Sequence, residues 1–265
     1  MLIKEGLADE LGAKVCSIEP VPPMRSGPLT GAQRESSIVD VAGRISNAIQ
    51  AAIREGDFPV VIGGDHTSAI GFHTGLGEAY GETGIVWMDT HSDLNTPSTS
   101  PSGNMHGMVL AGLLGKGSDA MVQATAACRI LEEHIGMVGI RATDTAEQQW
   151  IDTGRMHCMT MDDVRERGLD QCLADAVRTA DGADAGYGLT IDLDVIDPSQ
   201  APFVATPVDG GIDAKELVSC LSTFQFSNRL LGLEVTEFTP RNDEDVHFAC
   251  KLVTNIVKAV TDGDV

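Results

Sequence analysis

Short runs of apolar residues alternate along the chain with segments in which apolar residues recur every three or four positions. The runs are rich in β-branched residues and nearly uninterrupted, which is typical of parallel strands covered on both faces. They predict buried strands at residues 58–62, 85–88, 135–140, 187–193 and 230–235. The amphipathic segments predict helices at residues 37–54, 213–224 and 243–260. Asp213 and Asp243 open the last two and can cap their first turns.

The order strand, loop, helix repeats and predicts an α/β fold with a mostly parallel sheet. The chain has 265 residues, 42% of them hydrophobic, which is enough for one large core, so we expect residues 1–265 to form a single domain. Gly75 and Gly77 resemble part of a dinucleotide-binding fingerprint, but they fall in a helical segment and lack the third glycine at the required spacing. Dinucleotide binding is therefore not predicted.

The charge is strongly negative, with 39 acidic and 18 basic residues and a formal net charge of −21. Such a surface repels nucleic acids and anionic membranes, so neither is an expected partner; it could equally mark a salt-tolerant host. We find no run of about 18 apolar residues and no apolar signal segment near the N-terminus. The six cysteines are scattered without a CxxC pair, and we interpret them as reduced core thiols of a cytoplasmic protein.

Residues able to bind metal follow four of the predicted strands. Ligands of parallel sheets bind at the carboxyl ends of the strands, so side chains placed there meet at one edge. The four ends supply His66, then Asp89, His91 and Asp93, then Asp192 and Asp194, and finally Glu237. We therefore expect these side chains to surround one site.

The spacing of these residues indicates a metal site. In extended backbone, residues i, i+2 and i+4 face the same side, so Asp89, His91 and Asp93 can enter one pocket, and Asp192 with Asp194 can enter the same one. Carboxylates gathered in this way repel one another unless they bind cations. Mixed carboxylate and imidazole ligands favour Mn²⁺, and six ligands suit two ions that share bridging carboxylates. Each motif taken alone could instead be a helix cap or a tight turn.

Four blocks of the sequence resemble the signature motifs of the ureohydrolase family, and within it those of the arginases. They are GGDHT at 63–67, DTHSDLNTPSTSPSGNMHGM at 89–108, DLDVIDP at 192–198 and GLEVTEFTP at 232–240. The resemblance implies a three-layer α/β/α sandwich of the arginase–deacetylase type that binds two Mn²⁺ ions per chain. One ion would be held by His66, Asp89, Asp93 and Asp192, and the other by Asp89, His91, Asp192 and Asp194.

The activity that the resemblance implies is the hydrolysis of L-arginine to L-ornithine and urea by a hydroxide that bridges the two ions. Asp93 would orient the hydroxide, and Glu237 would pair with the substrate guanidinium. His106 stands where arginases keep a histidine that shuttles protons, so it would protonate the departing amine.

The loop at 95–104 resembles the arginase clamp for the α-carboxylate of the substrate. Asn95, Ser102 and Asn104 would be its donors, because short polar side chains on a bent loop can donate hydrogen bonds at close range. Asp144 and Glu147 fall where arginases hold the α-ammonium group. An acid-rich helix start accounts for these two residues equally well.

The chain departs from the family pattern in two places. It begins after the strand and glycine-containing loop with which arginases start, so the resemblance implies a sheet that lacks the family's first strand. Phe203, Val204 and Ala205 stand in a loop that is richer in glycine in the family, so we expect a differently shaped pocket. Two alternatives stay open: an amidinohydrolase for another guanidino compound (Nω-hydroxyarginine, agmatine or guanidinobutyrate), and a metal-binding pseudoenzyme. The family also suggests a homo-oligomer, either a trimer or a hexamer.

Overall fold

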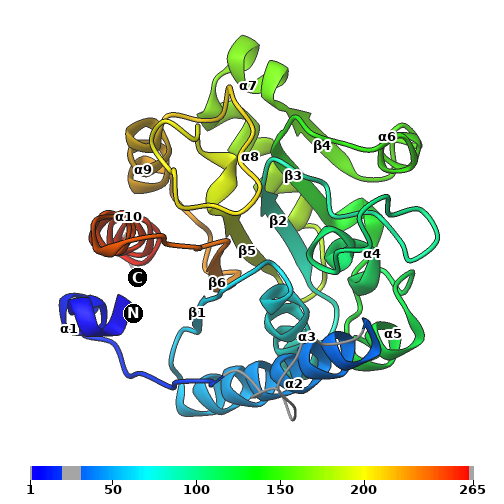
Figure 1. Ribbon diagram of the computed structural model, residues 1–265, viewed down its shortest axis with the longest axis horizontal. Helices are drawn as coiled ribbons and strands as arrows, with labels where there is room; N and C mark the ends of the chain where they lie inside the picture. Colours follow the sequence, from blue (N-terminus) through cyan, green and yellow to red (C-terminus); the bar gives the residue numbers. More distant parts are fainter. Residues whose placement is uncertain (1, 20–30, 263–265) are drawn as a thin grey trace.

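The structure, a computed structural model, describes residues 2–19 and 31–262. Within these ranges the chain forms a parallel sheet of six strands in the order β1-β6-β5-β2-β3-β4 (Figure 1). The strands are β1 (Val60–Ile62), β2 (Gly84–Met88), β3 (Ile135–Ile140), β4 (His157–Thr160), β5 (Tyr187–Asp192) and β6 (Leu230–Thr236). From β2 the chain adds β3 and β4 on one side and then β5 and β6 on the other, so the strand order reverses between β2 and β5.

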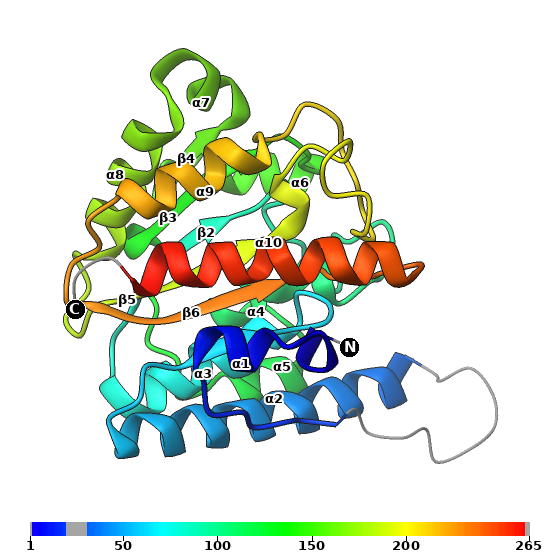
Figure 2. The same ribbon diagram turned by 90° about the vertical axis from the view of Figure 1, so that its left-hand side faces the viewer.

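Helices cover both faces of the sheet, which gives the three layers that the family resemblance predicts. On one face lie α1 (Leu7–Leu11), α7 (Met161–Arg167), α8 (Leu169–Ala180), α9 (Ala214–Thr223) and α10 (Asp243–Thr261). On the other lie α2 (Gly31–Glu55), α3 (Ser68–Tyr80), α4 (Val109–Leu113), α5 (Asp119–Ala124) and α6 (Thr145–Ile151). The short α1, near the N-terminus, packs against the C-terminal helix α10 (Figure 2).

Both faces of β2 are buried, as its uninterrupted apolar sequence predicts. Ile85 and Trp87 join the apolar cluster on the face of α2 to α6, whereas Val86 and Met88 join the cluster on the opposite face. Alternate side chains of a strand point to opposite faces, so a strand covered on both sides needs an apolar residue at every position.

The predicted strands are confirmed, with small differences in their limits. β1 begins at Val60 rather than at Phe58, since Phe58 is exposed and Pro59 has no N–H for the sheet. β4 was not predicted, because it lies at the edge of the sheet and only Met159 of its four residues is buried. The absence of the family's first strand stays a prediction.

The three predicted helices are also confirmed, and one of the two expected caps is wrong. Asp213 caps α9 by accepting hydrogen bonds from the N–H groups of Lys215 and Glu216. In α10, Asn242 is the cap and accepts from the N–H of Asp245, so Asp243 lies in the first turn instead. Asparagine and aspartate cap helices about equally well, so the sequence alone does not decide whether Asn242 or Asp243 caps α10.

Two glycines of α3 allow α2 to approach closely. A Cβ atom built at Gly71 would lie 2.5 Å from the backbone oxygen of Ala42, and one built at Gly75 would lie 2.9 Å from Cβ of Ile49. Real Cβ atoms do not pack this closely, so the contact between the two helices requires glycine at both positions. Helix packing thus accounts for Gly75 without any bound nucleotide.

Two predictions from composition can be compared with the structure. All six cysteines lie in the described ranges and are free thiols; the prediction of core thiols is confirmed for Cys172, Cys220 and Cys250, which are buried, and is wrong for Cys16, which is exposed. Among the described residues, no helix has both the length and the apolar character that a membrane span requires.

Candidate active site

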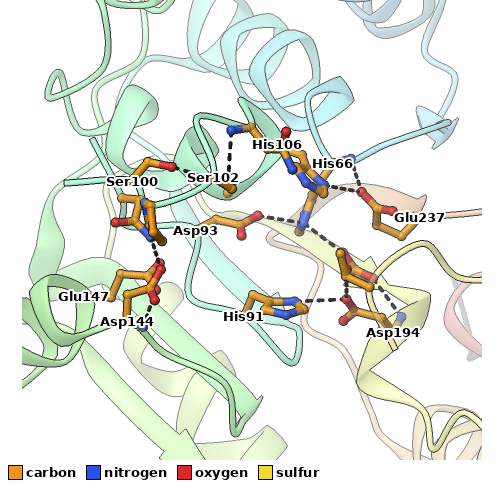
Figure 3. A pocket seen from close by; sticks show the side chains of 16 residues that line it. His66, His91, Asp93, Ser100, Ser102, His106, Asp144, Glu147, Asp194 and Glu237 are labelled. Carbon is orange, nitrogen blue, oxygen red and sulfur yellow. Dashed lines mark hydrogen bonds and ion pairs between the residues drawn. The ribbon is translucent and has the colours of Figure 1, made fainter. Parts of the chain in front are cut away.

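The carboxyl ends of β1, β2, β5 and β6 meet at one edge of the sheet, beside the point where the strand order reverses. Parallel α/β proteins bind their ligands at such a point. A cavity of about 240 Å³ opens there (Figure 3). Every site residue that the sequence predicts lines this cavity except Asp89, which is completely buried and contacts His66 and His91.

His66 follows β1 and is buried among three carboxylates. Its Nδ1 lies 3.0 Å from Oδ2 of Asp93, 3.0 Å from Oδ2 of Asp192 and 3.2 Å from Oδ2 of Asp89. One ring nitrogen cannot donate to three oxygens, and within the described ranges neither Nδ1 of His66 nor Oδ2 of Asp93 has an aligned hydrogen-bond partner. Buried polar atoms need a partner, and a divalent cation would satisfy this nitrogen and these oxygens together.

A second group of ligand atoms adjoins the first. Nδ1 of His91 lies 3.0 Å from Oδ2 of Asp194 and 3.8 Å from Oδ1 of Asp89. The ligand atoms of His66, Asp89 and Asp192 all lie within 4.8 Å of one another, as do those of Asp89, His91 and Asp194. Asp89 belongs to both groups through different oxygens. The arrangement therefore fits two cations that share a bridging carboxylate.

Burial and mutual repulsion hold protons on this cluster. Burial, with Asp194 and Asp93 nearby, raises the pKa of Asp89 to about 8, and burial with the neighbouring carboxylates raises the pKa of Asp192 well above its usual range. Burial lowers the pKa of His91, but the hydrogen bond with Asp194 and the negative charges of Asp89, Asp194 and Asp93 together raise the pKa to about 9. Near neutral pH these groups hold protons that a bound cation would displace.

The extended backbone that the sequence predicted is present at Asp192 and at His91, which forms a parallel β-bridge with Ala142, but it does not continue through the two motifs. Oδ1 of Asp89 accepts from the N–H of His91 at 2.7 Å, and Oδ1 of Asp192 accepts from the N–H of Asp194 at 2.7 Å. Each aspartate thus turns the chain by bonding to the backbone two residues on. Asp194 lies in the 3-10 helix η4 (Leu193–Val195), so the extended geometry expected there is wrong, although the predicted ligands do converge.

Left-handed backbone brings two further carboxylates into the site. Among residues 2–19 and 31–262, the two residues other than glycine with positive φ are Asp93 (φ 51°) and Glu237 (φ 61°). The extended conformation predicted through Asp93 is therefore wrong at this residue. The left-handed region costs an L-residue roughly 1–2 kcal/mol, and strain of this kind concentrates at functional sites.

Glu237 follows β6 and is fixed by the loop after β1. Its N–H donates to the carbonyl of Gly64 at 2.8 Å, and its Oε1 accepts from the N–H of His66 at 2.9 Å. The same Oε1 lies 3.2 Å from Nδ1 of His106, and this hydrogen bond raises the pKa of His106 although burial opposes it. Oε2 of Glu237 is buried and has no hydrogen-bond partner among the described residues, so it can accept from a cationic group.

Residues 95–104 form the rim of the cavity, which is buried at Asn95 and exposed at Ser102 and Asn104. Nδ2 of Asn95 donates to Oδ2 of Asp144 at 2.8 Å. Oγ of Ser102 accepts from the N–H of Asn104 at 3.1 Å, which leaves the hydroxyl hydrogen of Ser102 able to donate to a ligand. Ser100, which was not predicted, also lines the rim and lies beside Ser102 (Figure 3).

Asp144 and Glu147 line the cavity and also form the start of α6. Oε2 of Glu147 accepts from the N–H of Asp144 at 2.8 Å, and Oε1 accepts from Oγ of Ser92 at 2.9 Å and from the N–H of Leu94 at 3.0 Å. The interpretation as a helix start is thus confirmed for Glu147. Its carboxylate connects the start of α6 to Ser92 and Leu94, the two neighbours of Asp93 in the chain. Burial raises the pKa of Glu147, although these hydrogen bonds act against it.

Trp87 and Thr206 contact the metal ligands and were not predicted. The ring of Trp87 stacks on His66 with centroids 4.2 Å apart, and its Nε1 donates to Oδ2 of Asp89 at 3.0 Å. Its position two residues before Asp89, on the same face of the strand, is a signal that could have identified it. Thr206 lines the cavity, and its hydroxyl donates to Oδ2 of Asp194 at 3.0 Å.

The loop at 203–206 borders the cavity only in part, and the expected difference in pocket shape from the family stays a prediction. Among the described residues that line the cavity, this loop contributes Thr206 and neither Phe203 nor Val204. Phe203 is completely buried, with its ring centroid 5.8 Å from that of Phe238 and 6.0 Å from that of Phe248. A large aromatic ring gains more from packing in the core than from lining a polar cavity.

Comparison with known proteins places the chain in one family. A model of the Arginase family matches residues 11–259. The arginase of Bacillus caldovelox is 34% identical over 209 residues, which cover 78% of this chain and 70% of that protein. The arginase of Bacillus subtilis (strain 168) is 35% identical over 198 residues, which cover 74% of this chain and 67% of that protein.

The solved structures agree with the sequences. The crystal structure of arginase from Bacillus subtilis matches with a TM-score of 0.88 and 29% identity, over 100% of this chain and 91% of that one. The agmatine ureohydrolase of Thermoplasma volcanium, at 22% identity and a TM-score of 0.63, shares the fold. The four signature blocks, the sheet, the two ligand groups and these matches lead to one conclusion: the chain is a hydrolase that belongs to the arginase family.

Proposed function

We propose that this protein is a manganese-dependent arginase that hydrolyses L-arginine to L-ornithine and urea. The observation that carries the proposal is the pair of ligand groups that share Asp89, beside a cavity with a polar rim. Relatives that are 31–35% identical are named arginases, which supports the same reaction here.

Two Mn²⁺ ions are the cations that these residues fit best. One ion would be held by His66, Asp89, Asp93 and Asp192, and the other by Asp89, His91, Asp192 and Asp194. Carboxylate oxygens dominate each set and one imidazole joins it, a combination that suits Mn²⁺ better than Zn²⁺ or Mg²⁺. When bound, such ions supply Lewis-acid chemistry, because they lower the pKa of water towards neutrality.

The chain's own residues would orient the substrate and move protons. Oε2 of Glu237, which is buried without a partner among the described residues, suits the planar guanidinium group. Nδ1 of His106 lies 3.2 Å from Oε1 of the same carboxylate, so a proton on His106 is next to the guanidinium site. The raised pKa of His106 favours the protonated ring, and His106 can deliver its proton to the amine that leaves as ornithine. Oδ2 of Asp93 would orient the attacking water.

The rim of the cavity would select an α-amino acid. Asn95, Ser102 and Asn104 offer donors to the α-carboxylate, and Asp144 and Glu147 offer acidic groups near the α-ammonium. A hydrogen bond to a charged group contributes about 1.5–3 kcal/mol, so two or three of them suffice for a preference of a hundredfold or more. Agmatine has the same guanidinium and chain but no carboxylate, so it would not benefit from this clamp.

The proposal is tested with the Mn²⁺-loaded protein by the release of urea from L-arginine, agmatine and guanidinobutyrate, and by the release of hydroxyurea from Nω-hydroxyarginine. We expect kcat/KM for L-arginine to exceed that for agmatine by about a hundredfold or more. Ser102→Ala should narrow this gap by weakening arginine, whereas Ser98→Ala, in the same loop and away from the cavity lining, should leave it unchanged. Equal or faster turnover of agmatine would contradict the arginase assignment, and two bound ions without urea release would favour a pseudoenzyme.

A further inference from the structure

The carboxyl ends of β3 and β4 border a second cavity, with a volume of about 430 Å³. Arg141, which follows β3, lines this cavity and also reaches the candidate metal site. Its side chain is half-buried, and none of the catalytic steps proposed above uses it. The guanidinium group of Arg141 thus lies between the two cavities.

Arg141 binds four backbone carbonyls from three separate segments. Nη2 donates to the carbonyls of Asp194 and Val208, both at 2.9 Å. Nη1 donates to the carbonyls of Val195 at 3.2 Å and Gly139 at 3.4 Å. A guanidinium is a planar fork with fixed donor directions, so it holds these carbonyls in one relative position. Arg141 thereby connects the end of β3, the 3-10 helix η4 and the loop around Val208.

Two of these segments position the same metal ligand. The helix η4 contains Asp194, and the loop before Val208 contains Thr206, whose hydroxyl donates to Oδ2 of Asp194 at 3.0 Å. Arg141 therefore fixes the main chain of Asp194 by a direct hydrogen bond. It fixes the Asp194 carboxylate indirectly, through the loop that carries Thr206. His91, another ligand of this group, faces the same Oδ2 of Asp194 at 3.0 Å.

The backbone before Arg141 is shaped for this contact. The register between β3 and β4 shifts between Val138 and Ile140, and Gly139 has a φ of +94°. A Cβ atom at Gly139 would lie 2.6 Å from Cγ2 of Val195, so glycine is needed for the end of β3 to approach η4. Irregularities of this kind re-aim the side chains that follow them.

We propose that Arg141 is a positioning residue for the second cation, the one that His91 and Asp194 would hold. The geometry of its fork fixes Asp194 and the Thr206 loop, while His66 and Asp93 would hold the first cation from other strand ends. The inference rests on the proposed function, because it presupposes two cations. It predicts that loss of Arg141 weakens one binding step and spares the other.

The test is calorimetric titration of metal-free wild type, Arg141→Gln and Arg141→Lys with Mn²⁺ alone. Removal of the partners that orient a ligand typically weakens metal binding by about 10–100-fold, so in Arg141→Gln the second step should weaken at least about tenfold and the first should change less than about threefold. Arg141→Lys keeps the charge and loses the fork, so its second step should weaken as well. If the glutamine variant fails to fold, the lysine variant carries the same comparison.

The matched control is Arg165→Gln. Arg165 lines the same cavity, and its Nη2 donates to the carbonyl of Gly210 in the same loop at 2.7 Å. We expect both steps in this variant to match wild type. A further readout is amide hydrogen exchange in the metal-free proteins, which should accelerate in the loop around Val208 for Arg141→Gln and not for Arg165→Gln.

Each outcome decides a separate question. Two ions in wild type with an unchanged second step in both Arg141 variants overturn the inference and leave the proposed function standing. An equal weakening of both steps, or the same weakening in Arg165→Gln, shows a merely structural role and also overturns it. Fewer than two ions in wild type overturn the proposed function and, with it, this inference.

Discussion

Single residues at this site adopt backbone conformations that their neighbours do not share. Asp93 and Glu237 both have positive φ, and in both carboxylates one oxygen, Oδ2 of Asp93 or Oε2 of Glu237, has no aligned hydrogen-bond partner among the described residues. Side chains are directed inward here by a turn of the backbone rather than by the alternation of a strand. The sequence could identify these residues as acids at strand ends, but the φ angles depend on contacts with residues far along the chain, such as the bond from Glu237 to Gly64.

We predict that Asp93→Gly is more stable than Asp93→Ala by about 1 kcal/mol, because glycine adopts a φ of 51° without the Cβ contact that strains alanine. Both variants lose the carboxylate, so their difference reports the backbone alone. At Asp192, with a φ of −75°, the order should reverse, with alanine more stable by about 0.5–1 kcal/mol. Urea unfolding of the metal-free variants measures both differences, and the same order at both positions would contradict the left-handed geometry of Asp93.

His106 carries the second prediction at this scale. His106→Ala should lower kcat by about a hundredfold or more and leave both cations bound, because it removes a proton donor and no ligand. His247, whose side chain is 79% exposed, provides the control, and His247→Ala should leave kcat unchanged. Metal analysis beside the kinetics separates the roles: loss of an ion in His106→Ala would make this histidine a ligand or a structural residue.

At the scale of elements, prediction from sequence worked best where burial is complete. All five residues of β2 are buried, and their apolar run marked the strand almost to the residue. The edge strand β4 exposes His157 and Thr160, so it has no such run. The expectation that the segments after β2 and β5 continue as extended chain is wrong at Asp93 and Asp194. Asp89 and Asp192 bond to the backbone two residues on and turn it. Alternating sequence alone does not distinguish this turn from a strand.

The contact between α2 and α3 gives a prediction about packing. Gly71→Ala should lower the free energy of unfolding by about 1–3 kcal/mol, because its Cβ would lie 2.5 Å from the carbonyl oxygen of Ala42 and the helices would have to separate. Gly43, on α2, is the matched control, since among the described residues nothing lies within 4 Å of a Cβ built there. Gly43→Ala should stabilise the protein by about 0.5–1 kcal/mol through helix propensity alone. Chemical denaturation compares the two, and a neutral Gly71→Ala would contradict the close contact.

At the scale of the whole molecule, the site depends on segments that are distant in sequence. The strand order reverses between β2 and β5, and this places Asp89 beside Asp192 and Asp194. Motifs at strand ends allowed the ligands to be predicted, because a parallel sheet brings such ends together. The contacts of Arg141 with residues 194, 195 and 208 could not be predicted, because they depend on how two loops fold back against a bulged strand.

The stability of the metal-free protein should also depend on pH, because the cluster of candidate ligands titrates. Asp89 has a pKa of about 8 instead of 3.8, and His91 has a pKa of about 9 instead of 6.5. Both groups bind a proton more tightly in the folded state, so their contribution to stability is lost as the pH rises, from about 4 to 8 for Asp89 and from about 6.5 to 9 for His91. Burial raises the pKa of Asp194, but its side-chain hydrogen bonds and the charge of His91 together lower the pKa to about 2. Asp194 therefore acts in the opposite sense and only below about pH 4.

We therefore predict that the free energy of unfolding of the metal-free protein falls by about 2 kcal/mol or more between about pH 5.5 and pH 8.5. Manganese requires deprotonated ligands, so its binding should strengthen over the same range and reverse the trend. Urea unfolding in EDTA and in excess Mn²⁺ measures the two curves, and Asp89→Asn should flatten the curve in EDTA because it removes a titrating carboxyl from the cluster. If the metal-free protein instead becomes more stable towards pH 8.5, its carboxylates are ionised without a cation, and the electrostatic case for a paired metal site at Asp89 is lost.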